Sequence, residues 1–261
     1  MPEIPDIQNF SSNLKKLLIG KKLRKIQVIK GKKLNDNQSK LSKSLEGASV
    51  KDIYRSGKEL RFLFSNKIVL GMHLMLTGDI HFFEDVKAEN KYKSTIVEFI
   101  FQNGEGIVLA DRLGNANVRL NPVDKEGVDA LDPKLNYQYL KKICNSRAQI
   151  KNLLIDQNLI RGIGNSYSDE ILWETGISPF SIAKAIPDHK VKELAVNIKK
   201  VLKEAMKKIS KTHPGILHGE VKEFLKIHTK LRDKSPTGAP IKTASRGMLK
   251  TYYTEEQVLY Q

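Results

Sequence analysis

The sequence predicts an α+β protein with a β-rich N-terminal part, a helical part and a C-terminal hairpin. Between about Leu23 and Leu120, short segments of alternating apolar and polar residues dominate, with Gly, Asn and Lys turns between them, which is typical of strands. The segment from Asn121 to Lys134 has two prolines, several acidic residues and little periodicity, so we place a domain boundary there. We expect domains over residues 1–125, 126–226 and 227–261.

A helix is expected before the strands. Pro5 stands at a first-turn position, where proline is favoured, and Gly20 ends the helix. The apolar residues between them recur at helical spacing: Ile7, Phe10, Leu14, Leu17 and Leu18. The N-terminus of a helix carries a partial positive charge, which disfavours a protonated amine beside it.

The helical part contains four periodic segments: residues 137–144, residues 148–158, a segment that begins at Asn165 and a long one capped by Asp188. The long segment carries apolar residues on one face and many lysines on the other. In the last part, "SPTGAPIK" is expected to form a turn and "LKTYYTEEQVLY" a strand rich in tyrosine.

The charge of the chain predicts a polyanionic partner. Its 45 basic residues against 29 acidic ones give a formal net charge of +16. A surface that is merely solvated usually carries Lys and Glu in comparable numbers, and here the basic residues are spread along the chain. We therefore expect nucleic acid as the partner.

The single cysteine, Cys144, excludes a disulfide framework and a cysteine-based zinc site. The N-terminus lacks the basic and apolar regions of a signal peptide, and no apolar run is long enough to span a bilayer. We expect an intracellular protein, in the cytoplasm or nucleoid, with no membrane contact.

The first three residues, Met1, Pro2 and Glu3, suggest covalent chemistry. Removal of Met1 leaves Pro2 with a free secondary amine, and α-amino groups titrate near pH ~8. The uncharged amine can attack a sugar carbon and form an imine. The carboxylate of Glu3, one residue away, can move the protons.

The segment from Ile150 to Phe180, "IKNLLIDQNLIRGIGNSYSDEILWETGISPF", pairs two helices across a glycine turn. Glycines allow the backbone to approach nucleic acid, and the free amides at the start of the second helix, near Asn165, favour an anion. Lys151 adds a positive charge. The alternative for this segment is an ordinary helical hairpin.

With these motifs the chain resembles the formamidopyrimidine DNA glycosylase and endonuclease VIII family over nearly its whole length. "MPEIPDI" resembles the family's N-terminus, "RSGKELRFLF" the turn with its essential lysine, and "HLMLTG" the motif with a void-filling side chain. The glycine-turn segment resembles the family's helix-two-turn-helix. The resemblance implies an N-terminal β-sandwich with flanking helices, a helical domain and a hairpin finger.

The resemblance also implies roles for single residues. Pro2 would attack C1′ of the damaged nucleotide, and Glu3 would protonate the sugar oxygen and assist the later eliminations. Lys58 would contact the phosphate beside the lesion, and Lys151 and Asn165 would hold backbone phosphates. No cofactor and no metal are implied.

Two further residues come from "HLMLTG". Leu76 would wedge into the gap that the everted base leaves. His73 is either a histidine that supports the backbone near the DNA or an ordinary core residue.

The chain departs from the family in its finger, where many members bind zinc through four cysteines and this chain has none. The resemblance is therefore to a zincless finger. Its phosphate-binding arginine maps to Arg246, and two extra residues before Tyr252 make Lys250 a competitor.

Two more departures concern the lesion. In "DRLGNANVRL", Arg112 keeps the void-filling arginine's role if the loop is shortened, whereas an ungapped comparison puts Leu113 and Asn115 there. The segment "THPGILHGEVKEFLKIH" lacks the stretch that caps 8-oxoguanine in one branch of the family, and Asp6 replaces a glutamate. We therefore expect formamidopyrimidines, oxidised pyrimidines or abasic sites as substrates.

The sequence thus predicts a bifunctional DNA glycosylase and abasic-site lyase of base excision repair that acts on damaged double-stranded DNA as a monomer. One alternative is a catalytically inactive or lyase-only binder of damaged DNA. A more distant one is an RNA-binding protein, which the charge alone supports.

Overall fold

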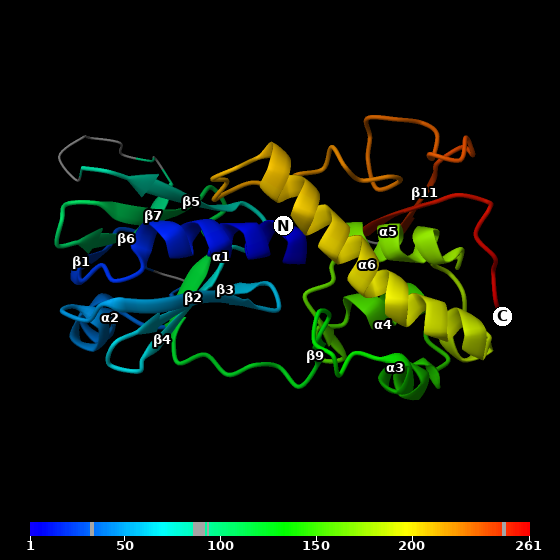
Figure 1. Cartoon of the computed structure of the whole chain (residues 1–261), viewed down its shortest axis with the longest axis horizontal. Coiled ribbons are helices and arrows are strands. Elements are labelled where there is room, and N and C mark those ends of the chain that lie inside the picture. Colours follow the sequence, from blue (N-terminus) through cyan, green and yellow to red (C-terminus); the bar gives the residue numbers. More distant parts are fainter. Residues whose placement is uncertain (32–33, 86–91, 93, 247–248) are drawn as a thin grey trace. The chain divides into compact units, whose positions relative to one another are not determined.

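The computed structural model describes residues 1–31, 34–85, 92, 94–246 and 249–261 (Figure 1). The chain divides into two compact units. Unit 1 comprises Met1–Asp124 and Ile209–Glu220, and unit 2 comprises Lys125–Lys208 and Val221–Gln261. The predicted α+β class is confirmed, and the separation of residues 227–261 as a third domain stays a prediction.

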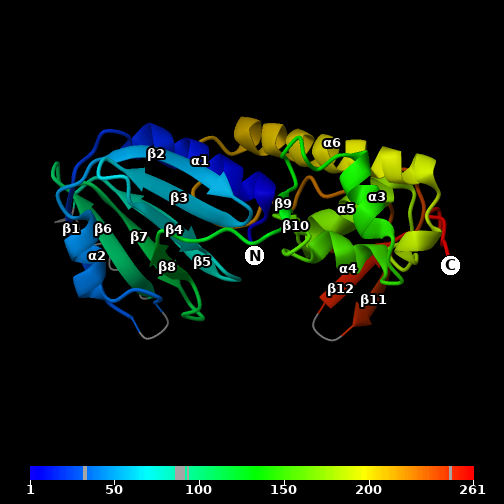
Figure 2. The ribbon, with the colours of Figure 1, turned by 90° about the horizontal axis from the view of Figure 1, so that it is seen from below.

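Unit 1 is built on two antiparallel four-stranded sheets (Figure 2). The first has the order β1-β6-β7-β5, with bounds Leu23–Val28, Thr95–Phe101, Gly106–Asp111 and Gly78–Phe83. The second has the order β2-β3-β4-β8, with bounds Val50–Ser56, Glu59–Phe64, Val69–His73 and Asn117–Leu120. Helix α1 (Ile4–Leu18) packs against β2.

One hydrophobic core joins both sheets to α1. Ile26 and Phe99 come from the first sheet, Phe62 and Met72 from the second, and all four are buried. Helix α1 adds residues at helical spacing to the same core: Ile7, Phe10, Leu14 and Leu18. The alternation of the strands and the period of the helix therefore serve one core, and the N-terminus of α1 is held against the sandwich.

Unit 1 also contains a helix that the sequence pattern did not predict, α2 (Gln38–Leu45). The side chain of Asn37 caps it by accepting the backbone N–H of Lys40 (3.0 Å). Leu41 and Leu45 are buried, four residues apart on one face. Two apolar positions in eight residues are too few to distinguish a helix from the strands around it.

Unit 2 is mainly helical. Its helices are α3 (Tyr137–Cys144), α4 (Ile150–Ile155), α5 (Asn165–Thr175), the short 3₁₀ turn η1 (Ala183–Ala185) and α6 (Asp188–Thr212), of which the residues from Ile209 belong to unit 1. Two short strands, β9 (Val128–Asp129) and β10 (Ile160–Arg161), pair in parallel. Helix α4 is shorter than predicted, because Asp156 leaves the helical conformation and its side chain accepts the N–H of Asn158 (2.8 Å).

The C-terminal hairpin pairs β11 (Lys242–Arg246) with β12 (Leu249–Tyr253). The "SPTGAPIK" stretch does form a turn, but it precedes β11 and does not connect the two strands. In it, Ser235 donates its N–H to the carbonyl of Ala239 (2.8 Å), and Gly238 has a φ of +92° that favours glycine.

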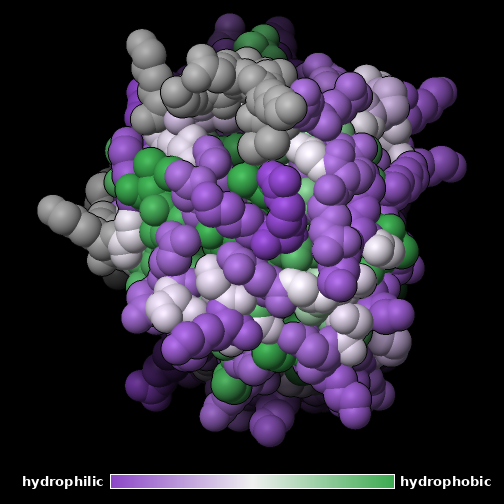
Figure 3. Space-filling model, turned by 90° about the vertical axis from the view of Figure 1, so that its left-hand side faces the viewer, coloured by the Kyte–Doolittle hydropathy of each residue, from purple (hydrophilic) through white to green (hydrophobic). Residues whose placement is uncertain are grey.

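One face of the molecule is largely hydrophilic. Hydrophilic residues dominate the face of the molecule in Figure 3, with smaller hydrophobic areas between them. Among the described residues, no helix is long and apolar enough to cross a membrane.

Candidate functional site

The N-terminal residues are fixed by the start of α1. Pro2 is buried, and Glu3 is the N-cap of the helix with only 5% of its surface exposed. The Asp6 carboxylate accepts the backbone N–H of Glu3 (3.1 Å), which completes a capping box. Helix capping thus holds Pro2 and the Glu3 carboxylate together at one place in unit 1.

Lys58 approaches the same place from the hairpin between β2 and β3. Because Ser56 pairs with Glu59, only Gly57 and Lys58 form the turn, and Gly57 has the positive φ (+57°) that such turns require. Burial lowers the pKa of Lys58, and the charges of Glu3 and Glu220 partly offset this shift. The Lys58 ammonium is therefore close enough to the carboxylates of Glu3 and Glu220 to interact with both charges.

Glu220, which the sequence did not single out, also lies at this place. Its carboxylate forms an ion pair with the amine of Met1. It lies more than 200 residues along the chain from that amine, and no spacing pattern links such distant positions. The only signal was the unusual segment around "ILHGEV".

Two exposed loop tips of unit 1 carry the predicted void-filling side chains. Leu76 is 62% exposed in the loop between β4 and β5, where Met75 has a positive φ of +54°. Arg112 and Leu113, both exposed, occupy a tight turn closed by the N–H of Gly114 on the carbonyl of Asp111 (3.1 Å). The turn thus exposes Arg112 and Leu113, whereas Asn115, the other candidate, is half-buried, and the void-filling role of each stays a prediction.

Asp111 ties these two loops together. Its carboxylate accepts the hydroxyl of Thr77 and the backbone N–H groups of Leu113, Asn115 and Ala116 (2.6–3.0 Å for the three amides). Burial by itself would raise the pKa of Asp111, but these hydrogen bonds hold it below its usual value. A carboxylate that stays ionised thus couples the Leu76 loop to the Arg112 turn.

His73 ends β4, and its Nδ1 accepts the backbone N–H of Met75 (3.0 Å). This contact fits the first of the two predicted roles, support of the backbone beside the Leu76 loop. Contact of His73 with DNA stays a prediction.

In unit 2, the glycine turn before α5 is held by Gln157. Its side-chain amide donates to the carbonyls of Ile155 (2.8 Å) and Ile163 (2.7 Å), and its oxygen accepts the N–H of Gly162 (2.9 Å). Gly162 has a φ of +101°, and Gly164 is the N-cap of α5. These hydrogen bonds fix the conformation of the turn, and Asn165 follows it as the first residue of α5.

Asn165 links the start of α5 to the hairpin, because its Nδ2 donates to the carbonyl of Lys250 (2.9 Å). The side chain of Lys250 is exposed, with its Nζ 5.3 Å from the ring centre of Tyr252. The backbone of Arg246 ends β11, and its side chain lies outside the described part of the chain. The structure thus brings Asn165 and Lys250 together.

Lys151 is buried, and its Nζ donates to Asp169 (2.6 Å) and to the hydroxyl of Thr251 (2.8 Å). The fully buried Asp169 carboxylate also contacts His228 Nδ1 (2.7 Å) and accepts the backbone N–H of Tyr252 (2.9 Å). Direct contact of Lys151 with phosphate stays a prediction; the geometry shows an ion pair that joins α4, α5 and β12.

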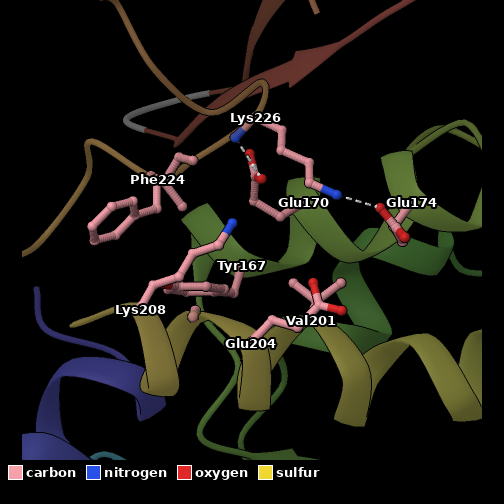
Figure 4. A pocket seen from close by; sticks show the side chains of 10 residues that line it. Tyr167, Glu170, Glu174, Val201, Glu204, Lys208, Phe224 and Lys226 are labelled. Atoms are coloured by element: carbon pink, nitrogen blue, oxygen red, sulfur yellow. Dashed lines mark hydrogen bonds and ion pairs between the residues drawn. The ribbon is translucent and has the colours of Figure 1, made fainter. Parts of the chain in front are cut away.

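Glu170, the residue after Asp169 in α5, holds the backbone of residues 226–228. Its carboxylate accepts the backbone N–H groups of Lys226, Ile227 and His228 (2.7–2.8 Å). Burial raises the pKa of Glu170, although these three amides act in the opposite direction. Figure 4 shows Glu170 beside a small pocket, where the Lys226 ammonium also reaches Glu174 (2.7 Å).

Asp169 and Glu170 were not identified from the sequence as functional. The sequence feature that could have drawn attention to them is that they are two adjacent acidic residues in a strongly basic chain. Among the described residues, no group of three or more His, Cys, Asp or Glu side chains is placed to hold a metal ion.

Two family models match the chain. The formamidopyrimidine-DNA glycosylase N-terminal domain matches residues 1–115, and the formamidopyrimidine-DNA glycosylase H2TH domain matches residues 127–214. The helix-two-turn-helix interpretation of the glycine-turn segment is therefore confirmed.

Curated relatives and solved structures agree with these models. The chain is 31% identical over 244 residues to the formamidopyrimidine-DNA glycosylase of Mycoplasma genitalium, covering 88% of this chain and 86% of that protein. It is 30% identical over 217 residues to that of Lactobacillus johnsonii, covering 79% and 78%. The fold matches the Lactococcus lactis formamidopyrimidine-DNA glycosylase bound to DNA containing an abasic site, with a TM-score of 0.85, 23% identity and 97% of each chain covered. The chain therefore belongs to the formamidopyrimidine-DNA glycosylase family.

Proposed function

We propose that this protein is a bifunctional DNA glycosylase and abasic-site lyase that removes oxidised bases from duplex DNA through the amine of Pro2. The observation that carries the proposal is the cluster at the N-terminus of α1. Pro2 is buried there beside the Glu3 carboxylate, and the charge of Glu3 acts on the Lys58 ammonium. An amine, a carboxylate and a phosphate-binding cation are what covalent excision requires.

The chemistry proceeds through a covalent intermediate. The Pro2 nitrogen bonds to C1′, and the glycosidic bond breaks with its electron pair moving to the departing base. Opening of the sugar ring, with a proton from Glu3 to the ring oxygen, leaves an iminium ion between Pro2 and C1′. This cation acidifies the C2′ proton, so that loss of the proton expels the 3′ phosphate and cuts the strand.

DNA binding in this proposal rests on phosphate contacts of both units. Lys58 holds the phosphate beside the lesion, and Asn165 with Lys250 or Arg246 holds the backbone from unit 2. Leu76, which is 62% exposed, enters the space left by the everted nucleotide. The protein acts as a monomer in the cytoplasm or nucleoid, and its affinity falls steeply with salt, because phosphate contacts release counterions.

Substrate choice in this proposal depends on the turn after Asp111, which carries Arg112 and Leu113. Leu113 offers no hydrogen bond to the orphaned partner base, and Arg112 beside it offers five donors. We propose broad acceptance of formamidopyrimidines, oxidised pyrimidines and abasic sites, with weak discrimination of the opposite base. A panel of lesions, each paired with all four bases and assayed for base release, tests this; strict preference for one pair would contradict it.

The proposal is tested by substitution of the nucleophile. In the processed protein, Pro2→Gly is expected to abolish base release while leaving affinity for an abasic-site duplex nearly unchanged, because phosphate contacts carry the binding. Lys15→Ala serves as the control, since the exposed Lys15 pairs with Asp52 on the surface of unit 1. Base release by Pro2→Gly at the unsubstituted rate would refute the proposed chemistry.

A further inference from the structure

Residues 213–220 form a strap that is fastened to unit 1. Leu217 is 7% exposed and belongs to the core, Asn13 of α1 donates to the carbonyl of Ile216 (2.9 Å), and Asp79 of β5 accepts the N–H of Gly219 (3.2 Å). Gly219 has a φ of +83°, which permits a sharp change of direction just before Glu220. The position of Glu220 is thus set by three independent attachments.

At the end of the strap, the Glu220 carboxylate pairs with the amine of Met1, with 22% of its side-chain surface exposed. Only the Cα and the carbonyl carbon of Met1 separate this amine from the nitrogen of Pro2. The Glu220 carboxylate therefore lies within about 6.5 Å of the Pro2 nitrogen, close enough to reach it directly or through one water molecule. Removal of Met1 takes away its own amine and makes the Pro2 amine the new end of the chain.

We propose that Glu220 is a second carboxylate of the reaction centre, which accepts the proton of the Pro2 nitrogen as this nitrogen bonds to C1′. The inference rests on the proposed function and adds a division of labour to it. Glu3, the N-cap of α1, serves the sugar oxygen, and Glu220 serves the amine.

The proton balance supports two carboxylates. Attack by the uncharged secondary amine forms the bond between nitrogen and C1′ and leaves a positively charged nitrogen that still carries its proton. Glu220 takes this proton and becomes neutral, which returns the lone pair to nitrogen. Glu3 enters this step as the carboxylic acid, having taken a proton from solvent. The lone pair then forms the double bond to C1′ as the ring oxygen departs with the proton of Glu3, which becomes a carboxylate.

The charged groups around Glu220 determine the pH dependence. The charges of Glu220 and Glu3 both act on the Lys58 ammonium, which lies in the turn between β2 and β3. The Pro2 nitrogen follows directly after the residue that Glu220 contacts. On its own strap, His218 contacts the ring of His81 (4.8 Å between centroids), and Asp79 holds Gly219. A carboxylate beside an ammonium favours the charged amine, so loss of the Glu220 charge shifts the pH of half-maximal reaction downward.

The test compares Glu220→Gln with Glu220→Asp and the control Glu223→Gln. Glu223 is an exposed carboxylate on the same segment, so its substitution makes the same change of charge away from the strap. Each processed protein is mixed with a duplex containing an abasic site, and the rate of the borohydride-trapped complex is followed from about pH 5 to 9. Affinity for the duplex is measured separately without borohydride.

We expect Glu220→Gln to slow trapping at the plateau by about 100-fold, the lower range for loss of a general base. Affinity for the duplex stays close to that of the unsubstituted protein, the half-maximal pH moves downward, Glu220→Asp recovers part of the rate, and Glu223→Gln behaves like the parent. A Glu220→Gln protein with the parent's plateau rate and half-maximal pH would overturn the inference. If the unsubstituted processed protein itself fails to trap, the proposed function fails instead, so the two failures are distinguishable.

Discussion

The buried ion pair between Lys151 and Asp169 gives a sharp test of how unit 2 holds α4, α5 and β12 together. Asp169→Asn preserves the shape of the side chain but removes its charge. The Lys151 ammonium, 5% exposed, then loses the charge of Asp169 that it pairs with, while its bond to the neutral hydroxyl of Thr251 stays. Breaking one side of a buried pair destabilises a protein by about 3–5 kcal/mol, because a buried charge is left uncompensated.

The assay is urea unfolding of the full chain followed by the fluorescence of Trp173, the single tryptophan, which lies in α5 with Asp169. With a slope of about 2 kcal/mol per M, the expected loss lowers the midpoint by about 2 M. Glu193→Gln is the matched control, since its pair with Lys190 lies at the surface of the same unit and contributes at most about 1 kcal/mol.

The double substitution Lys151→Met with Asp169→Asn removes both charges and keeps an amide oxygen that can accept the N–H of Tyr252. It is expected to recover part of the stability, because no buried charge is then left without its partner. A midpoint for Asp169→Asn that equals the Glu193→Gln control would refute the view that this pair holds α4, α5 and β12 together.

Further predictions concern unit 1 and the finger. Leu76→Ala is expected to slow base release about 10-fold in single turnovers, the low end of what one apolar contact in a pocket contributes. Val196→Ala, 65% exposed on α6, is expected to leave the rate unchanged. A Leu76→Ala rate equal to that of the unsubstituted protein would contradict the insertion of Leu76. Because burial lowers the pKa of Lys58, its ammonium form opposes folding. This cost increases as pH falls from the ordinary lysine pKa to the lowered one and is constant at lower pH. Lys58→Met should therefore raise the unfolding midpoint at pH 7, by circular dichroism, while weakening DNA binding; a lower midpoint would contradict this. Arg112→Ala and Leu113→Ala, assayed with each opposite base, show which side chain meets the orphaned base, and an unchanged pattern in both would contradict a role for the turn. Chelators are expected to leave DNA binding intact, and stoichiometric zinc in metal analysis would contradict a zincless finger.

The sequence predicted those parts of the fold that local chemistry determines. Pro5 and the apolar spacing after it gave the start of α1 within one residue, and the glycines before Asn165 gave the start of α5. Both boundaries depend on caps and breakers that act over a few residues. Helix α2 was not predicted, because its two buried leucines are four residues apart, and this spacing puts both on one face in a helix and in a strand alike.

The parts that could not be predicted depend on contacts between distant residues. Glu220 reaches the N-terminal amine only because Leu217 enters the core and Asp79 holds Gly219. Lys151 looked like a surface cation on a helix, and its burial depends on the Asp169 carboxylate of another helix. Neither the charge of these residues nor their spacing along the chain predicts that they form ion pairs.

The most direct test of the central claim is the identity of the residue that bonds to the sugar. The processed protein is trapped with borohydride on a duplex containing an abasic site, digested, and the modified peptide is sequenced by mass spectrometry. We expect the sugar remnant on the nitrogen of Pro2, and we expect protein that retains Met1 to bind the duplex without forming the adduct. An adduct on Lys58, or on any other lysine with Pro2 unmodified, would contradict it.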